Sequence, residues 1–260
     1  MRIRHKPWAQ PELDACPFFI KDSYGMAEKW RSAFARPEAP LFVELGCGKG
    51  AFVAAEAPRN PQFNFLEVDI KSEVLMIAKR AAEHEFDTLH RTPDNIGIAA
   101  FDIERISTVM TAADSVDRLY INFPNPWPKP RHRKRRLTHP RALLHYRTFL
   151  RDGAVVHFKT DDTELFCDSL EYFELCGYEL RRVSADLYSE TKPRGPMTEH
   201  EKMFTDRGLP IHYIEAVKLP DEVFALQKAE NLAHFGDERC DEKELRYIEN
   251  AKQSIAALCL

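Results

Sequence analysis

The sequence lacks any uninterrupted apolar run of about 20 residues, the length that a membrane-spanning helix needs. Residues 1–17 are charged and interrupted by prolines, so they do not resemble a secretory signal, and we expect a cytoplasmic protein with no membrane partner. The six cysteines include no C-x-x-C pair and match no zinc framework, so we expect reduced thiols and no metal. Internal repeats and low-complexity tracts are also missing. What is present is a chain of 260 residues, 44% hydrophobic and 30% charged, which is long enough to bury a large core.

The net charge of −4 is distributed unevenly along the chain. Residues 221–260 contain nine acids and five Lys or Arg, so residues 1–220 are neutral as a whole. Within that neutral part, residues 129–151 contain nine Lys or Arg and no acid. Phosphate binding needs a basic face rather than a basic protein, so this segment is compatible with a nucleic-acid partner.

From residue 41 onward, short apolar runs alternate with amphipathic stretches. Strands are expected at residues 41–45, 63–68, 96–100, 118–123, 154–159 and 211–217. Helices are expected at residues 51–57, 71–86, 139–149 and 165–175. This alternation predicts an α/β fold with a mostly parallel sheet and helices on both faces. We expect an N-terminal extension over residues 1–40, one catalytic domain over 41–218, and an acidic helical tail over 219–260.

A glycine-rich turn, Gly46-Cys47-Gly48-Lys49-Gly50, follows the first strand. Such a turn can be a plain strand–helix connection or part of a dinucleotide loop, but the third glycine arrives one residue too early for G-x-G-x-x-G. The carboxylate of Glu44, two residues before the turn, would repel a pyrophosphate and attract an ammonium group. S-adenosylmethionine carries that ammonium and no phosphate. Acids also follow the next two strands: Asp69, with Glu67 as its rival, for the ribose hydroxyls, and Asp102 for the adenine amino group.

The fourth strand leads into the loop formed by residues 122–136, which contains four prolines. Loops placed by a rigid sheet commonly carry the functional site. Six of the eight residues 129–136 are Lys or Arg, so a phosphate backbone is expected to lie there. The residues expected to contact RNA phosphate are Arg131, Arg133, Lys134, Arg135 and Arg136. Nearby histidines lack paired acids at ligand spacing and are interpreted as RNA-facing or structural rather than metal-binding.

Together these segments resemble the bacterial tRNA (guanine-N7)-methyltransferases. The family pattern V-E-x-G-x-G-x-G is matched at Val43 to Gly50, and the long F-x-D-P-W-P-K-x-R-H-x-K-R-R-L pattern at Phe123 to Leu137. F-K-T-D is matched at Phe158 to Asp161, and T-E-x-E at Thr198 to Glu201. The resemblance covers roughly residues 40–218. It implies a class I, Rossmann-like methyltransferase fold, S-adenosylmethionine as methyl donor, and a guanine of the tRNA variable loop, at tRNA position 46, as acceptor.

The resemblance also implies roles for individual residues. Donor binding corresponds to Glu44, Gly46, Gly48, Asp69, Asp102 and Asn125. Substrate binding corresponds to Lys129, Asp161, Thr198, Glu199, His200 and Glu201. Asn125 stands where the family has its catalytic Asp, and it is the catalytic candidate here.

Guanine N7 has a free lone pair, so its methylation requires no general base, and we expect Asn125 to slow the reaction rather than abolish it. Two alternatives stay open. One is an inactive or weakened tRNA-binding homologue, because of Asn125. The other is an NAD-dependent oxidoreductase, because of the glycines. The sequence does not determine the oligomeric state, although a monomer is favoured.

Overall fold

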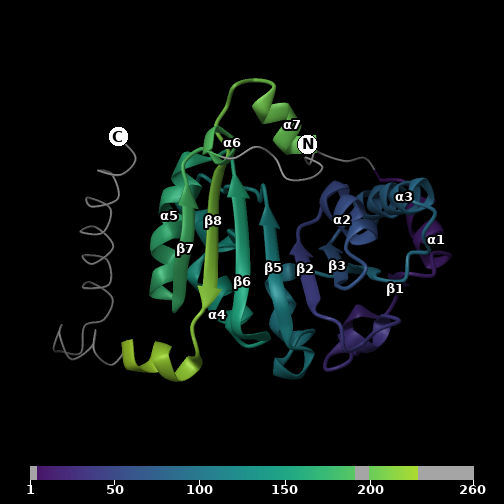
Figure 1. Ribbon diagram of the computed structural model, residues 1–260, viewed down its shortest axis with the longest axis horizontal. Coiled ribbons are helices and arrows are strands. Elements are labelled where there is room, and N and C mark those ends of the chain that lie inside the picture. Colours follow the sequence, from purple (N-terminus) through teal and green to yellow (C-terminus); the bar gives the residue numbers. More distant parts are fainter. Residues whose placement is uncertain (1–4, 191–198, 228–260) are drawn as a thin grey trace.

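The structure, a computed structural model, describes residues 5–190 and 199–227. Within these ranges eight strands form one sheet in the order β1-β4-β3-β2-β5-β6-β8-β7 (Figure 1). The strands are β1 (Phe19–Ile20), β2 (Leu41–Leu45), β3 (Asn64–Asp69), β4 (Ile96–Ala100), β5 (Val116–Asn122), β6 (Leu150–Thr160), β7 (Tyr178–Ser184) and β8 (His212–Lys218). Neighbouring strands are parallel except at β8, which runs antiparallel to both β6 and β7. The predicted mostly parallel sheet is confirmed.

Helices cover both faces of this sheet, as predicted. On one face α1 (Ala9–Asp14), α2 (Ala51–Glu56) and α3 (Ser72–Thr88) enclose an apolar cluster over β2, β3 and β4. On the other face α4 (Pro140–Arg147) and α5 (Thr163–Leu175) pack on β5, β6 and β8 around a second cluster. Two short helices, α6 (Leu187–Glu190) and α7 (Glu199–Thr205), lie beyond the tips of β5 and β6 in Figure 1. Residues 221–227 are also helical.

The central strands β2 and β4 consist almost wholly of apolar residues, and β3 has an apolar majority among its inner positions. Every residue of β2 is buried, and β3 and β4 are buried up to their last residue. Continuous apolar runs of this kind are typical of parallel strands covered on both faces. Glu44 of β2 and Glu67 of β3 therefore stand out, because the fold buries both carboxyl groups within its sheet.

Residues 9–34 pack into the same body as the strands that follow them. Trp30 is fully buried, and its indole N–H donates to the carbonyl oxygen of Val109 at 2.5 Å. The Arg31 guanidinium donates to Asp117 at 2.9 Å, and β1 pairs with β4 at one edge of the sheet. The domain boundaries at residues 41 and 218 stay a prediction.

The strand order changes direction at β2. The chain runs from β2 outward through β3 to β4, and then returns to form β5 on the other side of β2. Open α/β sheets bind ligands in the crevice outside the carboxyl ends of the strands at such a switch point. The carboxyl ends of β2 and β5 therefore mark where a site is expected.

Candidate functional site

The glycine-rich turn after β2 leaves space at its first two glycines and none at its third. All three have positive φ angles, 74° at Gly46, 55° at Gly48 and 71° at Gly50. A Cβ added at Gly48 would meet no atom within 4 Å, and one at Gly46 would have its nearest neighbour, Leu137 Cδ1, at 3.7 Å. A Cβ at Gly50 would lie 2.4 Å from the Cβ of Ala78. Gly46 and Gly48 thus leave room for a ligand, whereas Gly50 lets the turn pack against α3.

Two unsatisfied acceptors lie side by side at the switch point. Glu44, the penultimate residue of β2, is only 3% exposed, and its Oε1 accepts a hydrogen bond from Asn122 Nδ2 at 2.9 Å. Glu44 Oε2 and Asn122 Oδ1 are both buried and have no hydrogen-bond partner. Burial raises the pKa of Glu44 to about 8, against the opposing effect of the Asn122 hydrogen bond. A cationic group with several N–H donors would satisfy both oxygens, so the ammonium of S-adenosylmethionine fits these residues and a pyrophosphate does not.

The acids that follow β3 and β4 differ in how they are placed. Asp69 is half-buried at the end of β3, where it accepts hydrogen bonds from the backbone N–H groups of Gly48 at 3.3 Å and Lys71 at 3.1 Å. Its rival Glu67 is fully buried, and its Oε1 lies 2.8 Å from the position of a Cβ on Gly50. Glu67 therefore points under the turn, and Asp69 lies at its rim. Asp102, after β4, accepts from the N–H of Glu104 at 3.0 Å and begins a short 3-10 helix, Ile103–Thr108.

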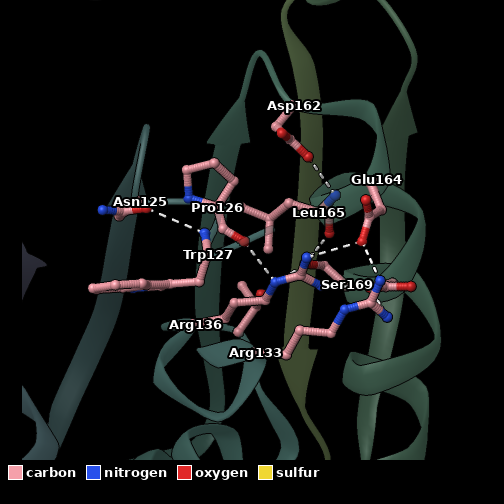
Figure 2. Close-up of polar contacts among 11 residues, drawn as sticks. Asn125, Pro126, Trp127, Arg133, Arg136, Asp162, Glu164, Leu165 and Ser169 are labelled. Atoms are coloured by element: carbon pink, nitrogen blue, oxygen red, sulfur yellow. Dashed lines mark hydrogen bonds and ion pairs between the residues drawn. The ribbon is translucent and has the colours of Figure 1, made fainter. Parts of the chain in front are cut away.

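The loop after β5 holds two aromatic residues in left-handed backbone conformations. Phe123 has a φ of 49° and Trp127 a φ of 44°, which is rare for bulky side chains and costs energy. Asn125, the catalytic candidate, is exposed, and its Oδ1 accepts the Trp127 N–H at 3.1 Å (Figure 2). The Trp127 ring stacks on His132 with ring centroids 5.6 Å apart, and the Arg135 guanidinium lies 5.3 Å from the Trp127 centroid. Asn125 thus shapes the strained turn that presents Trp127.

The helix α7 is attached to the end of β6 by an ion pair whose carboxylate is buried. Lys159 Nζ donates to Glu201 Oε1 at 2.5 Å, and the Tyr188 hydroxyl donates to the same oxygen at 2.7 Å. Phe123 stacks on His200 of α7 with centroids 5.6 Å apart, which joins α7 to the loop after β5. The predicted substrate residues His200 and Glu201 are therefore brought to the same edge of the sheet as the glycine-rich turn.

The remaining predicted substrate residues are less constrained. Asp161 is exposed directly after β6, and Lys129 is exposed where the 3-10 helix Pro130–Arg135 begins. Glu199 is the first residue of α7, and Thr198 lies outside the described residues.

The five predicted phosphate contacts do not form one exposed surface. Arg131, Lys134 and Arg135 are exposed, as expected. Arg133 keeps 34% of its side chain exposed but pairs with Glu164. Arg136 is different, because its side chain is fully buried and bonded inside the protein. The prediction that Arg136 contacts phosphate is wrong, since a buried guanidinium is out of reach of the nucleic-acid backbone.

Sequence reasoning missed two polar residues that the structure places in the site, Asn122 and Lys159. Each lies at the carboxyl end of a central strand, where β5 and β6 approach the glycine-rich turn. The available signal was a polar residue in the last two positions of a strand. Side-chain pairing across strands, as between Asn122 and Glu44, was not readable without the register.

The described parts of the chain contain neither a cluster of metal ligands nor a membrane-spanning helix. Within residues 5–190 and 199–227, no three His, Cys, Asp or Glu side chains gather as a metal site would require. Across the same residues, no helix combines the length and the apolar character needed to cross a bilayer.

Comparison with known proteins agrees with this geometry. A family model described as "Putative methyltransferase" matches residues 38–214. The tRNA (guanine-N(7)-)-methyltransferase of Clostridium perfringens is 46% identical over 84% of this chain and 100% of its own length. Those of Clostridium beijerinckii and Acetivibrio thermocellus are 45% and 44% identical, each over 84% of this chain, covering 99% and 100% of the relative.

Among solved structures, the 16S rRNA methyltransferase KamB aligns with a TM-score of 0.55 at 15% identity. The alignment covers 74% of this chain and 92% of that one. This likeness confirms the predicted class I, Rossmann-like methyltransferase fold. With near-complete coverage of its curated relatives, the chain belongs to the tRNA (guanine-N7)-methyltransferase family.

Proposed function

We propose that the protein transfers the methyl group of S-adenosylmethionine to N7 of a guanine in tRNA, at position 46 of the variable loop. The observation that carries this proposal is the 46% identity to a curated tRNA (guanine-N(7)-)-methyltransferase over that relative's whole length. The reaction would take place in the cytoplasm, as the sequence led us to expect.

The donor site proposed here lies around the glycine-rich turn. When bound, S-adenosylmethionine supplies an electrophilic methyl group on a sulfonium. Glu44 and Asn122 would hold its ammonium, because each has a buried oxygen that no protein donor reaches. Asp69 would accept from the ribose hydroxyls and Asp102 from the adenine amino group. Gly46 and Gly48 leave the backbone open to close approach.

The acceptor chemistry asks for positioning rather than proton abstraction. Guanine N7 attacks through its own lone pair, so the residues around it must aim that pair and exclude water. Asn125 and Trp127 sit on the loop after β5, next to the switch point, and Asp161 is exposed at the end of β6. We assign Asn125 to orienting the acceptor and Asp161 to accepting hydrogen bonds from its N1–H and N2 amino edge.

The tRNA backbone would lie along the exposed part of the basic segment. Lys129, Arg131, Lys134 and Arg135 are exposed and lie in the second half of the loop after β5, ahead of α4. Their positive charges can displace condensed counterions from phosphates, which makes binding strong and dependent on salt.

The decisive experiment is methyl transfer from labelled S-adenosylmethionine to unmodified tRNA, with the methylated nucleoside identified after digestion. We expect 7-methylguanosine, formed only with tRNAs that have a guanine at position 46. Binding of tRNA and of S-adenosylhomocysteine without any transfer would favour the inactive homologue that Asn125 raises as an alternative. Tight binding of NAD would support the oxidoreductase alternative, which the paired acceptors Glu44 and Asn122 disfavour.

A further inference from the structure

We infer that Arg136 is a positioning residue that fixes the conformation of the loop carrying Asn125 and Trp127, an inference that rests on the proposed function. The Arg136 side chain is fully buried, although it belongs to a strongly basic segment. Its Nε donates to the carbonyl oxygen of Pro126 at 2.7 Å (Figure 2). Pro126 lies between Asn125 and Trp127, so this hydrogen bond anchors the backbone at the centre of the turn.

The other side of the guanidinium is tied to α5. One terminal nitrogen of Arg136 donates to Asp168 Oδ2 at 2.5 Å, and the other donates to Glu164 Oε1 at 3.2 Å. Asp168 is only 6% exposed, so the first of these pairs lies in the interior. Arg136 therefore joins the loop after β5 to a helix more than 25 residues further along the chain. Arg133 reaches the same two acids, but only Arg136 also bonds the Pro126 carbonyl oxygen.

The helix end that receives Arg136 is itself rigid. Asp162 caps α5 by accepting the Leu165 N–H at 2.7 Å, and Leu165 is fully buried in the core. Beside Arg136, the hydroxyls of Thr138 and Ser169 form a buried hydrogen bond at 2.7 Å. The loop is thus anchored to an element that is fixed by packing.

The arginine at position 136 is better explained by the loop geometry that it fixes than by a contribution to stability. A buried ion pair gives little net stability, because desolvation offsets much of the attraction. Arginine, unlike lysine, presents donors in several fixed directions, which is what bonds to Pro126, Asp168 and Glu164 require. Next to Arg136, Trp127 keeps a left-handed backbone that persists only when its surroundings hold it. We therefore assign to the Arg136 guanidinium the role of holding this strained turn in place. Through the turn it also positions Asn125 at the methyl-transfer site.

The test compares Arg136→Lys with Arg147→Lys. Arg147 is a matched control, because its buried guanidinium also bonds a carboxylate, Asp221 at 2.5 Å, and a carbonyl, Gly177 at 2.6 Å. It ends α4 just before β6 begins, which places it at the opposite end of the strands from the loop after β5. Both variants are expected to lower the unfolding temperature.

Only Arg136→Lys should lower kcat for tRNA methylation, by about tenfold or more, because a small displacement of the reacting groups is costly. KM for tRNA, its dependence on salt and the affinity for S-adenosylhomocysteine should each stay within about twofold of wild type. In a Trp8→Phe background, acrylamide should quench Trp127 fluorescence more strongly in Arg136→Lys, since Trp30 is fully buried. A raised KM with a flatter salt dependence and unchanged kcat would instead mean that Arg136 binds phosphate. An equal loss of kcat in both Lys variants would mean a purely structural role.

If Arg136→Lys does not fold, Asp168→Asn serves the same purpose, because it keeps an acceptor for Arg136 and removes only the charge. It should lower kcat and increase Trp127 quenching in the same direction, and no change in either would overturn the inference. If wild type does not methylate tRNA, the proposed function fails, whereas the quenching comparison still tests whether Arg136 orders the loop.

Discussion

Asn125 differs from an aspartate by one atom, and the structure shows what that atom can change. Its Oδ1 accepts the Trp127 N–H, which an aspartate oxygen would do equally well, so Asn125→Asp should keep the turn. The added charge would favour the cationic guanine product without providing a needed base. We expect kcat to rise by about tenfold or less, roughly 1.4 kcal/mol in the barrier, in single-turnover methylation of tRNA.

Asn125→Ala is the companion variant. It removes the side-chain oxygen that caps the Trp127 N–H, so the loss in kcat should exceed the gain from Asn125→Asp. If wild type transfers no methyl group to any tRNA and Asn125→Asp switches transfer on, catalysis here depends on the carboxylate, and positioning is insufficient.

Glu44 should make donor binding depend on pH. Its pKa is about 8 in the free protein because it is buried, so below that pH the carboxyl must lose a proton before it can pair with an ammonium. The affinity for S-adenosylhomocysteine should therefore rise between pH 6 and pH 8, by up to about tenfold per pH unit, with proton uptake by the buffer seen in calorimetry. Glu44→Gln should bind far more weakly and with little pH dependence. Unchanged affinity in Glu44→Gln would remove Glu44 from the donor site.

At the scale of elements, the sequence predicted the interior strands and long helices well and the edges poorly. The strands β2 to β6 and the helices α3 and α5 were expected because apolar runs and 3–4 spacing are strong signals. β7 was missed because Tyr178–Ser184 mixes charged and apolar residues, as edge strands do. The two-residue strand β1 was also missed, because so short a strand is defined only by its pairing with β4 in the folded protein.

In the candidate site, the sequence predicted which residues take part but not which contacts they make. Motif matching selected Glu44 and Asn125, because the family patterns place an acid before the glycine-rich turn and a catalytic residue before P-W-P-K. It could not tell that Arg136 is buried while Arg135 is exposed, because burial depends on acids of α5 that lie far along the chain. It also left Asp69 and Glu67 as rivals, which only the position of the turn separates.

The exposed basic residues ahead of α4 should determine how tRNA binding depends on salt. Replacing the exposed Arg131, Lys134 and Arg135 with Ala should weaken tRNA binding and lower the slope of log affinity against log salt by about two to three, because up to three phosphate contacts are lost. The affinity for S-adenosylhomocysteine should not change. Filter binding over a range of salt concentrations measures both the affinity and the slope.

A control variant removes the same number of positive charges from other parts of the surface. Lys29, Arg59 and Arg181 are exposed cations outside the segment, and their combined replacement by Ala should leave the salt slope as in wild type. Equal effects of the two triple variants would mean that the basic segment acts only through the overall charge.

For the molecule as a whole, the sheet buries two carboxyl groups and a histidine that titrate in opposite senses. Glu44 and Glu67 are paired in register on β2 and β3, and burial raises the pKa of both. Groups with a raised folded pKa stabilise the fold at low pH and lose that contribution as pH rises through the folded value. Burial lowers the pKa of His157 to about 3, so its contribution is present above its unfolded pKa of about 6.5 and is lost below it. Of these three groups, only the two carboxyl groups still lose a stabilising contribution as the pH rises above about 6.5.

The protein should therefore lose stability between pH 6.5 and pH 8, as measured by urea unfolding without ligand. Glu44 alone, with a folded pKa of about 8, accounts for roughly 1.5 kcal/mol of this loss, and Glu67 adds to it in the same direction. Glu44→Gln and Glu67→Gln should each reduce the loss, and the double variant should be nearly flat across this window. His157→Gln should leave the change between pH 6.5 and pH 8 as in wild type, because the histidine titrates at lower pH. A double carboxyl variant that still loses as much stability as wild type would show that groups other than these two buried acids control the alkaline side of the stability curve.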